Sequence, residues 1–343
     1  MKAIVFHKPG GPEQLKSAEY PTPQPGAGEI TVRVRACSLN HLDLWVLSGL
    51  PAYKISLPHA LGCDIAGEVE EIGEGVAGLK KGERVVLYPV ESCGKCEWCQ
   101  AGQENRCVER TVIGAGPRWG GYAEVVRALA SSAVKIPENL SFEEAASIPV
   151  ASLTAWHMLV TLAGLREGQS VLVLGAGGGV GAAALTIARA MKARVFATAS
   201  REDKRQKAKA LGAEAVLDHS VPHLAKQVND LTGGRGVDVV MENIGPAVFK
   251  EAVQSLATGG TLVTCGATSG PEATLQLRYL FSRELTIKGA YIGSSSEFRQ
   301  VVDAYGSGLL KPVIDSKYPV AEAAKGLARM ISRESFGKIL LVH

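Results

Sequence analysis

The chain has 343 residues, more than one hydrophobic core usually accommodates, so its length predicts two domains. Hydrophobic residues make up 46% and charged residues 21%, which excludes a disordered or fibrous chain. The formal net charge of +3 is too small to indicate a nucleic acid or an acidic membrane surface as a partner. No apolar run approaches the ~18 residues needed to span a bilayer, and the first residues lack the pattern of a signal peptide. These features predict a soluble, cytoplasmic protein.

The first 150 residues have the pattern of a β-rich domain. Residues 32–36 alternate apolar and polar side chains, as a half-buried strand does. Residues 66–72 and 83–88 are further candidate strands, and both lie next to glycine-containing turns. Short strands separated by turns predict a small barrel or sandwich.

From about residue 148 onward, apolar β runs alternate with helical stretches, which predicts a parallel sheet with crossover helices. The six runs are residues 171–174, 194–198, 215–217, 237–241, 261–264 and 285–289. Six runs favour an α/β doubly wound nucleotide-binding sheet. The tail after about residue 309 is mixed and ends in a strand-like run, 338–342.

A glycine-rich loop, residues 175–181, lies between the first of these runs and the helical stretch 182–191. Such a loop allows a tight turn, a close approach of backbone N–H groups to a pyrophosphate, and packing of the helix on the strand. The spacing is G-x-x-G-x-x-G, because Val180 stands where a strict G-x-G-x-x-G would have its third glycine. The sequence therefore predicts a dinucleotide site. Its predicted members in the loop are Gly175, Gly178, Gly179, Val180 and Gly181.

The end of the second run bears on the choice of nucleotide. An acidic residue there commonly binds the ribose 2′-hydroxyl of NAD, whereas an Arg accommodates the 2′-phosphate of NADP. This chain has Ser200 and Arg201 at that position and Lys204 close behind, while Glu202 and Asp203 are expected in the first turn of the next helix. The pattern favours NADP(H) over NAD(H). The alternative is that these charges only form a solvated helix start.

Four of the seven cysteines fall within fifteen residues, in the spacing C-x2-C-x2-C-x7-C. In a chain with no export signal, such clustering favours a metal over disulfides. Four thiolates on one lobe can close a tetrahedral zinc site that has no open position, which is a structural site. An iron–sulfur cluster and free thiols are the alternatives. The predicted zinc ligands are Cys93, Cys96, Cys99 and Cys107.

Together these motifs resemble the medium-chain dehydrogenase/reductase superfamily, which contains the zinc alcohol dehydrogenases and the quinone reductases. Segments 1–5, 120–124, 153–156 and 232–238 add to the resemblance, which covers nearly the whole chain. It implies a GroES-like β-barrel catalytic domain formed by residues 1–147 and 309–343, with a zinc lobe at about 90–110. It also implies a Rossmann domain at 148–308, with Thr154 among the cofactor-binding residues. The active site is then expected in the cleft between the two domains.

The ligands of a catalytic zinc do not carry over from the alcohol dehydrogenases. By resemblance, Asn40, Cys63 and Val150 stand at the three ligand positions, and Asp64 replaces the Glu that follows the second ligand. One thiolate cannot hold a catalytic zinc, which normally has three protein ligands. Asn40 with Asp43 instead resembles the Asn-x-x-Asp of quinone reductases, which use no catalytic metal. Those proteins normally lack the zinc lobe, so the chain combines features of both branches.

The first hypothesis is the reduction of an electron-poor carbonyl compound, such as a quinone or an enone, by NADPH. The cofactor carries out the chemistry, while the protein supplies orientation and a dry cleft. In this hypothesis Asn40 orients or polarises the substrate, and Asp43 supports that wall or relays a proton. Tyr53 or His41 could then donate a proton to the developing oxyanion.

Two further hypotheses remain open at this stage. A substitute catalytic zinc could be held near Cys63, with His41 and Asp64 as the other leading ligands and with Cys37 and His59 in the same region. The chain could instead bind NADPH as a non-catalytic sensor or structural protein.

The expected partner is a small carbonyl, alcohol or quinone substrate rather than a nucleic acid or a membrane. By resemblance a homodimer or homotetramer is also expected, with residues 285–291 at an interface.

Overall fold

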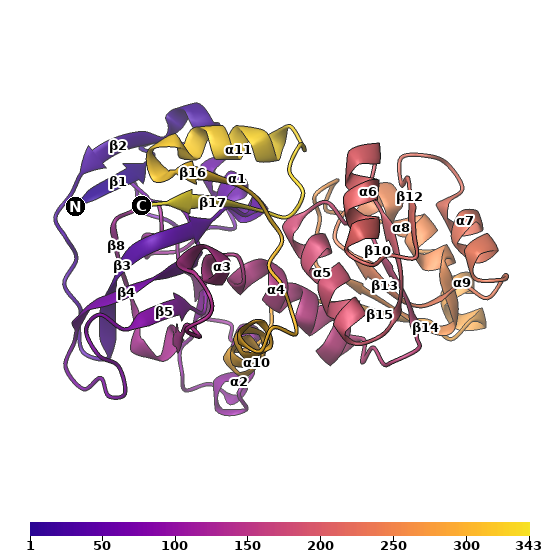
Figure 1. Cartoon of the computed structure of the whole chain (residues 1–343), viewed down its shortest axis with the longest axis horizontal. Coiled ribbons are helices and arrows are strands. Elements are labelled where there is room, and N and C mark those ends of the chain that lie inside the picture. The colour runs from indigo at the N-terminus through magenta and orange to yellow at the C-terminus, as the bar shows by residue number, and fades with distance from the viewer. The chain divides into compact units, whose positions relative to one another are not determined.

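The structure, a computed structural model, describes all 343 residues, and the chain divides into two compact units (Figure 1). The first unit comprises Met1–Val150, Ser294–Gly308 and Ile314–His343. The second comprises Ala151–Gly293 and Leu309–Val313. This division differs from the expected domains in three segments, because 148–150 and 294–308 group with the first unit and 309–313 with the second.

Three contacts explain why residues 294–308 group with the first unit. The aromatic rings of Phe298 and Tyr88 lie 5.8 Å apart, and the amide of Asn139 donates to the carbonyl of Gly306. The Glu104 carboxylate accepts from the backbone N–H of Ser295, at the start of helix α10 (Ser295–Gly306). None of these partners is near α10 in the sequence, so periodicity alone gives no sign of this packing.

The first unit is built on a seven-stranded sheet with the order β16-β17-β3-β4-β5-β9, and β8 also pairs with β3. Only the β16–β17 pair is parallel. The strands of this sheet are β3 (Glu29–Ser38), β4 (Asp64–Ile72), β5 (Arg84–Leu87), β8 (Val125–Leu129), β9 (Ala133–Lys135), β16 (Ile314–Pro319) and β17 (Lys338–Val342). Two small sheets pair β1 (Lys2–Val5) with β2 (Lys16–Glu19) and β6 (Val90–Glu91) with β7 (Thr111–Val112).

Short helices complete the first unit. They are α1 (His41–Leu47), α2 (Glu97–Gln100), α3 (Phe142–Ala146), α10, α11 (Ala323–Ile331) and the 3-10 turns Pro12–Gln14, Glu104–Arg106, Ala130–Ser132 and Val320–Glu322. Helix α4 (Pro149–Trp156) begins in the first unit and ends in the second.

Strand β3 shows how the sequence pattern leads to the site. Arg33 and Arg35 are exposed and Val34 is buried, which confirms the strand predicted from the alternation at 32–36. The alternation stops at the end of β3, where Cys37 and Ser38 are both buried. A strand end that is buried on both faces lies inside the unit, and the polar Ser38 there needs an internal hydrogen-bond partner.

The second unit contains a parallel six-stranded sheet with the order β12-β11-β10-β13-β14-β15. Its strands are β10 (Ser170–Val173), β11 (Arg194–Thr198), β12 (Ala215–Leu217), β13 (Val237–Glu242), β14 (Leu256–Thr264) and β15 (Thr286–Gly289). Its helices are α5 (Gly179–Ala190), α6 (Glu202–Ala210), α7 (Leu224–Leu231), α8 (Pro246–Gln254), α9 (Leu277–Ser282) and the π-helical segment His157–Leu162. All six predicted runs are strands, and the doubly wound fold is confirmed. The strand order reverses between β10 and β13, the kind of switch point at which such sheets bind ligands.

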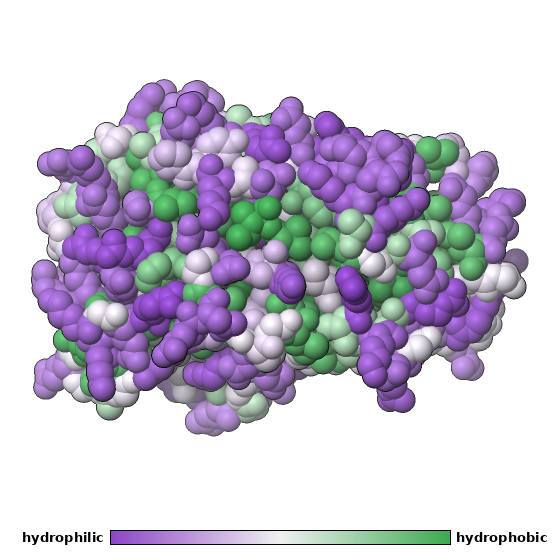
Figure 2. Space-filling model, viewed as in Figure 1, coloured by the Kyte–Doolittle hydropathy of each residue, from purple (hydrophilic) through white to green (hydrophobic).

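Apolar side chains fill a separate core in each unit. The face seen in Figure 2 mixes hydrophilic and hydrophobic residues. None of the helices has both the length and the apolar character that crossing a lipid bilayer requires.

Candidate functional site

The four cysteines of the predicted metal lobe lie together in the structure. Cys93 and Cys96 come from the loop after β6, Cys99 from α2, and Cys107 follows the turn Glu104–Arg106. The Sγ–Sγ distances are 3.9 Å for Cys93–Cys99, 3.5 Å for Cys96–Cys99 and 3.6 Å for Cys93–Cys107. Four sulfurs bound tetrahedrally at about 2.3 Å from zinc would lie roughly 3.8 Å apart. The spacing of the sulfurs therefore suits a zinc ion.

Local electrostatics also favour a thiolate in this lobe. The backbone N–H groups of Lys95 and Cys96 lower the pKa of Cys93 to about 7. Against the backbone N–H of Cys99, burial and the neighbouring thiols raise the pKa of Cys96 to about 11, so the first thiolate forms at Cys93. A thiolate is the form that binds metal, so a lowered pKa makes metal binding easier near neutral pH.

The glycine loop has the geometry that a nucleotide-binding turn requires. Gly175 has a φ of +66°, a left-handed conformation that favours glycine. A Cβ on Gly181 would lie 2.3 Å from the carbonyl oxygen of Gly175, so helix α5 can pack on the loop only with glycine there. A Cβ on Gly178 would have the Gly175 oxygen as its nearest neighbour at 3.7 Å, so the space beside Gly178 is open. Gly179 and Val180 begin α5.

Two buried side chains that sequence reasoning missed, Thr198 and Glu242, support the glycine loop and the turn that follows β13. Thr198 Oγ1 accepts from the backbone N–H of Gly175 at 3.1 Å and also contacts His219 Nδ1 at 3.0 Å. Glu242, at the end of β13, accepts from the N–H groups of Ile244 and Gly245 and from the Thr264 hydroxyl. A polar residue at the end of an apolar strand is the only sequence sign of such a role.

The residues predicted to choose the nucleotide have separate surroundings. The Arg201 guanidinium lies on Asp203, the Arg205 guanidinium contacts Asp218 and Glu202, and Ser200 is exposed. Glu202 and Asp203 lie in the first turn of α6, as expected. Lys204 is buried and lies over the glycine loop, because a Cβ on Gly177 would be 2.8 Å from Lys204 Cδ and 3.2 Å from its Nζ. Thr154 is buried in α4.

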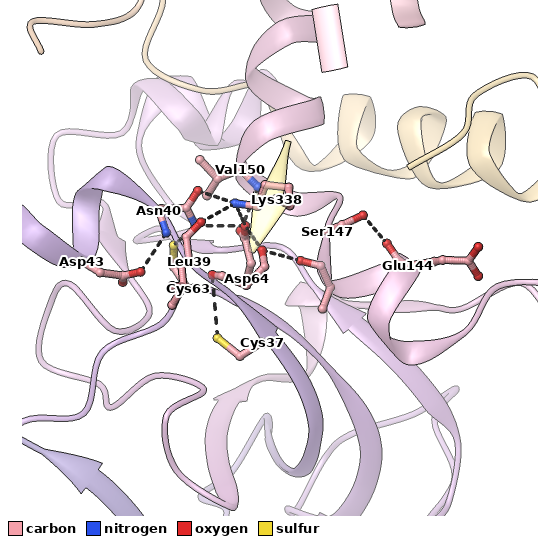
Figure 3. A network of polar contacts seen from close by, with 12 residues as sticks. Cys37, Leu39, Asn40, Asp43, Cys63, Asp64, Glu144, Ser147, Val150 and Lys338 are labelled. Carbon is pink, nitrogen blue, oxygen red and sulfur yellow. Dashed lines mark hydrogen bonds and ion pairs between the residues drawn. The ribbon is translucent and has the colours of Figure 1, made fainter. Parts of the chain in front are cut away.

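The predicted catalytic residues Asn40, Cys63 and Asp64 converge in the first unit (Figure 3). Asn40 follows β3, and Cys63 and Asp64 lead into β4, which pairs with β3. The Asn40 Nδ2 group donates to Asp64 Oδ2 at 2.9 Å and lies 3.4 Å from Cys63 Sγ. Burial and then the charges of Asp64 and Asp43 raise the pKa of the Cys63 thiol well above its ordinary value.

A residue that the sequence did not single out, Lys338, lies at the centre of this group (Figure 3). Its Nζ donates to the carbonyl of Leu39 at 2.7 Å, to Asn40 Oδ1 at 2.8 Å and to Asp64 Oδ2 at 3.0 Å. The Lys338 and Asp64 side chains are 6% and 0% exposed, so this is a buried ion pair. The only sequence sign was a lysine at the head of the apolar run 338–342, and nothing near it indicates a partner 274 residues away.

Asp64 connects this network to the rest of the unit. Its Oδ1 accepts from the backbone N–H of Val150 at 2.9 Å, near the start of α4. The Ser38 hydroxyl lies 2.8 Å from both Asp64 Oδ2 and the carbonyl of Ala146. The three positions matched to zinc ligands, Asn40, Cys63 and Val150, are therefore brought to one place.

Asp43 supports the network from the first turn of α1. Its Oδ2 accepts from the backbone N–H of Asn40 at 2.8 Å and lies 3.4 Å from the Tyr122 hydroxyl. Burial raises the pKa of Asp43 to about 7, against the opposing effects of the Asn40 N–H and the Lys338 ammonium.

The other candidate residues lie around this network. His41 is exposed at the start of α1, and burial of part of its ring with the charge of Lys338 lowers its pKa. Tyr53 is half-buried in the segment between α1 and β4. The His59 ring contacts the carbonyl of Gly114, and Cys37 Sγ is packed where a Cβ on Gly62 or Gly121 would lie.

These residues do not form a second metal site in the structure. The four-cysteine lobe is the only group of three or more His, Cys, Asp or Glu side chains whose ligand atoms lie close enough together for one ion. Near Cys63, the amide of Asn40 presents N–H groups, and both Asp64 oxygens accept hydrogen bonds from nitrogen donors. This donor set does not fit a divalent metal.

Two protein families match the chain. The family described as alcohol dehydrogenase GroES-like domain matches residues 26–138, and the one described as zinc-binding dehydrogenase matches residues 179–307. The first match lies in the first unit, and most of the second lies on the parallel sheet and its helices.

Individual relatives match over the whole length. A quinone oxidoreductase of Lama guanicoe is 33% identical, with 100% of this chain and 97% of that protein covered. An acryloyl-coenzyme A reductase of Metallosphaera sedula is 31% identical, with 99% of each covered. The crystal structure of an NAD-dependent alcohol dehydrogenase superposes with a TM-score of 0.96 at 42% identity and covers both chains fully.

Proposed function

We propose that the chain reduces electron-poor carbonyl compounds such as quinones or enones. The chain belongs to the medium-chain dehydrogenase/reductase superfamily and is an NAD(P)-dependent oxidoreductase. Membership of this superfamily supports the general reaction, which is hydride transfer between a nicotinamide and a small substrate.

The observation that carries the proposal is the hydrogen-bond network of Asn40, Asp64 and Lys338, in which Asn40 stands at a position matched to a zinc ligand. Because its donors do not fit a divalent ion, activation of the substrate falls to N–H groups. Such groups polarise an oxygen less than zinc does, so a substrate that is already activated suits them best. The relatives named for quinones and for acryloyl-coenzyme A support this class.

Each residue then has a definite role. A reduced nicotinamide, when bound, would supply the hydride. Asn40 donates an Nδ2 hydrogen to the substrate oxygen, since the contact of this group with Cys63 Sγ at 3.4 Å is weak and easily exchanged. Asp43 fixes the backbone of Asn40. His41 or Tyr53 supplies the proton that the reduced product needs.

The cofactor proposed is NADPH, bound at the glycine loop, with the charge of Lys204 and Arg201 on the side of the 2′-phosphate. The likeness to an NAD-dependent alcohol dehydrogenase makes NADH the competing choice, so both must be measured. One structural zinc is proposed in the lobe of Cys93, Cys96, Cys99 and Cys107, whose sulfur spacing suits it.

A homodimer or homotetramer is proposed to form through the edge strand β15, which pairs on one side only. Leu277 and Phe281 of the preceding helix α9 are 65% and 71% exposed, and such apolar side chains commonly become buried between subunits. A monomer in gel filtration with light scattering would contradict this assembly.

The first experiment is zinc per chain in purified, metal-washed protein, followed by turnover of quinones and enones with NADPH and NADH. One zinc and quinone or enone turnover would support the proposal. Two zincs with alcohol oxidation would instead support a zinc alcohol dehydrogenase, the alternative favoured by the likeness to an alcohol dehydrogenase.

Substitution then tests the role of Asn40. Asn40→Ala is expected to lower kcat by about 10²-fold, the cost typical of one lost oxyanion donor. The matched control is Asn139→Ala, because Asn139 is an exposed amide in the same unit that donates to Gly306. Equal activity of both variants would refute the role of Asn40.

A further inference from the structure

The buried lysine of the network has all three of its N–H bonds directed at named acceptors. They are the Leu39 carbonyl, Asn40 Oδ1 and Asp64 Oδ2, at 2.7, 2.8 and 3.0 Å. An ammonium has three donors and no acceptor, so its hydrogen-bonding capacity is filled. Lys338 therefore cannot contact a substrate while this network is intact, and any effect it has on the reaction must pass through its partners.

The contact with Asn40 sets the orientation of that amide. The two ends of an Asn side chain have nearly the same shape, and rotation by 180° exchanges an acceptor for a donor. With Lys338 beside one end, the oxygen must face the ammonium, because Nδ2 there would place donor against donor. The Nδ2 group then faces Asp64 and Cys63. The orientation follows from charge and does not rest on the packing of Asn40.

We infer that Lys338 is a positioning residue, which fixes the Asn40 amide with its N–H groups directed into the site and strengthens them as donors. The inference rests on the proposed function. A positive charge 2.8 Å from Oδ1 draws electron density through the amide, so the N–H groups at the other end become better donors. The ammonium thus supplies positive charge behind the donor at a place where the donor set does not fit a metal ion.

A purely structural reading of the ion pair gives a different expectation. Buried ion pairs contribute little net stability compared with apolar replacements, whereas removing one partner alone is costly because a buried charge is left behind. If Lys338 only neutralises Asp64, then replacing both residues by neutral ones should restore stability and activity together.

The test uses the variants Lys338→Met, Asp64→Asn and Lys338→Met/Asp64→Asn in the full-length protein. Each single variant leaves one buried charge without its partner, so we expect melting temperatures roughly 10 °C below wild type. The double variant carries no such charge and should regain at least half of that loss. The control is Lys317→Met, which removes a half-exposed lysine paired with Glu143 in the same unit and should leave both melting temperature and kcat nearly unchanged.

Between Asp64→Asn and the double variant, the order of activities should be the reverse of the order of stabilities. In Asp64→Asn the lysine still faces Asn40 Oδ1, so kcat should fall by about tenfold or less. In the double variant the amide can rotate, because Asn at position 64 can accept from or donate to Asn40. There kcat should fall by about 10²-fold, with KM changed less than threefold.

A double variant with kcat at or above that of Asp64→Asn would overturn the inference and leave the proposed function standing. Melting temperatures that are additive across the two substitutions would also overturn it, because the pair would then not be coupled. A wild-type protein that reduces no quinone or enone and oxidises no alcohol would overturn the proposed function, and this inference with it.

Discussion

Replacing Gly181 by Ala tests the packing of helix α5 on the glycine loop. The new Cβ would lie 2.3 Å from the Gly175 oxygen and 2.9 Å from the Ala176 Cα, and both are backbone atoms that cannot rotate away. Overpacking of this kind costs about 1–3 kcal/mol. The higher helix propensity of Ala offsets at most about 1 kcal/mol of that cost. A contact of 2.3 Å with backbone puts the cost at the upper end of that range, so the net loss is about 2 kcal/mol and the melting temperature should fall by roughly 4–6 °C.

Gly178→Ala is the matched variant in the same loop. Its Cβ would meet only the Gly175 oxygen, at an ordinary 3.7 Å, and Gly178 has a φ of −77°, which any residue adopts. Its melting temperature should change by less than half as much as that of Gly181→Ala. The open space beside Gly178 is where the loop is predicted to approach a phosphate, and a Cβ would fill part of that space. The affinity of the Gly178→Ala variant for NADPH should therefore fall about tenfold.

The assay is thermal unfolding of both variants together with titration of NADPH followed by its fluorescence. Gly181→Ala should lose both stability and nucleotide affinity, because a displaced helix misdirects the N–H groups of the loop. An unchanged melting temperature for Gly181→Ala would refute the packing argument. Wild-type affinity in Gly178→Ala would refute the predicted approach of the phosphate.

Three further predictions concern metal, pH and cofactor. Cys107→Ser should lose the zinc detected by mass spectrometry and lower the melting temperature, and unchanged zinc content would contradict the proposed lobe. Since the pKa of Asp43 is raised to about 7, the native state retains a proton that the unfolded state has lost between about pH 4 and 7. Stability should therefore fall as pH rises through this range, by up to about 1.4 kcal/mol per pH unit, and level off above pH 7. Urea unfolding at several pH values should show this slope in the wild type but not in Asp43→Asn, and parallel curves would exclude Asp43 as its source. Lys204→Met should weaken NADPH binding about tenfold and NADH binding less than threefold, and equal losses would argue against recognition of the 2′-phosphate.

The features that the sequence predicted are those whose partners are close in the chain. The strands at 32–36 and 171–174 follow from apolar patterning, which depends only on neighbouring residues. The metal lobe spans fifteen residues, so the cysteine spacing alone places its sulfurs together. The glycine loop follows one strand and opens one helix, and its turn needs no distant partner.

The family resemblance also placed Asn40, Cys63 and Asp64 at one site. In the structure they are neighbours because strands β3 and β4, which carry or adjoin them, pair with each other. It gave no orientation for the Asn40 amide. That orientation depends on charge from a strand at the opposite end of the chain.

Only the tertiary structure showed Lys338 beside Asp64, and only it grouped helix α10 with the first unit. In both cases the contact joins segments more than 150 residues apart, and the sequence around each partner looks ordinary: a lysine before an apolar strand and a Glu in a short turn. Local patterning reports which face of an element is buried, whereas the identity of what covers it is decided by chain topology. The sequence thus determined the two-part fold, the glycine loop and the four-cysteine lobe, while the topology decided the charge that orients the candidate catalytic amide.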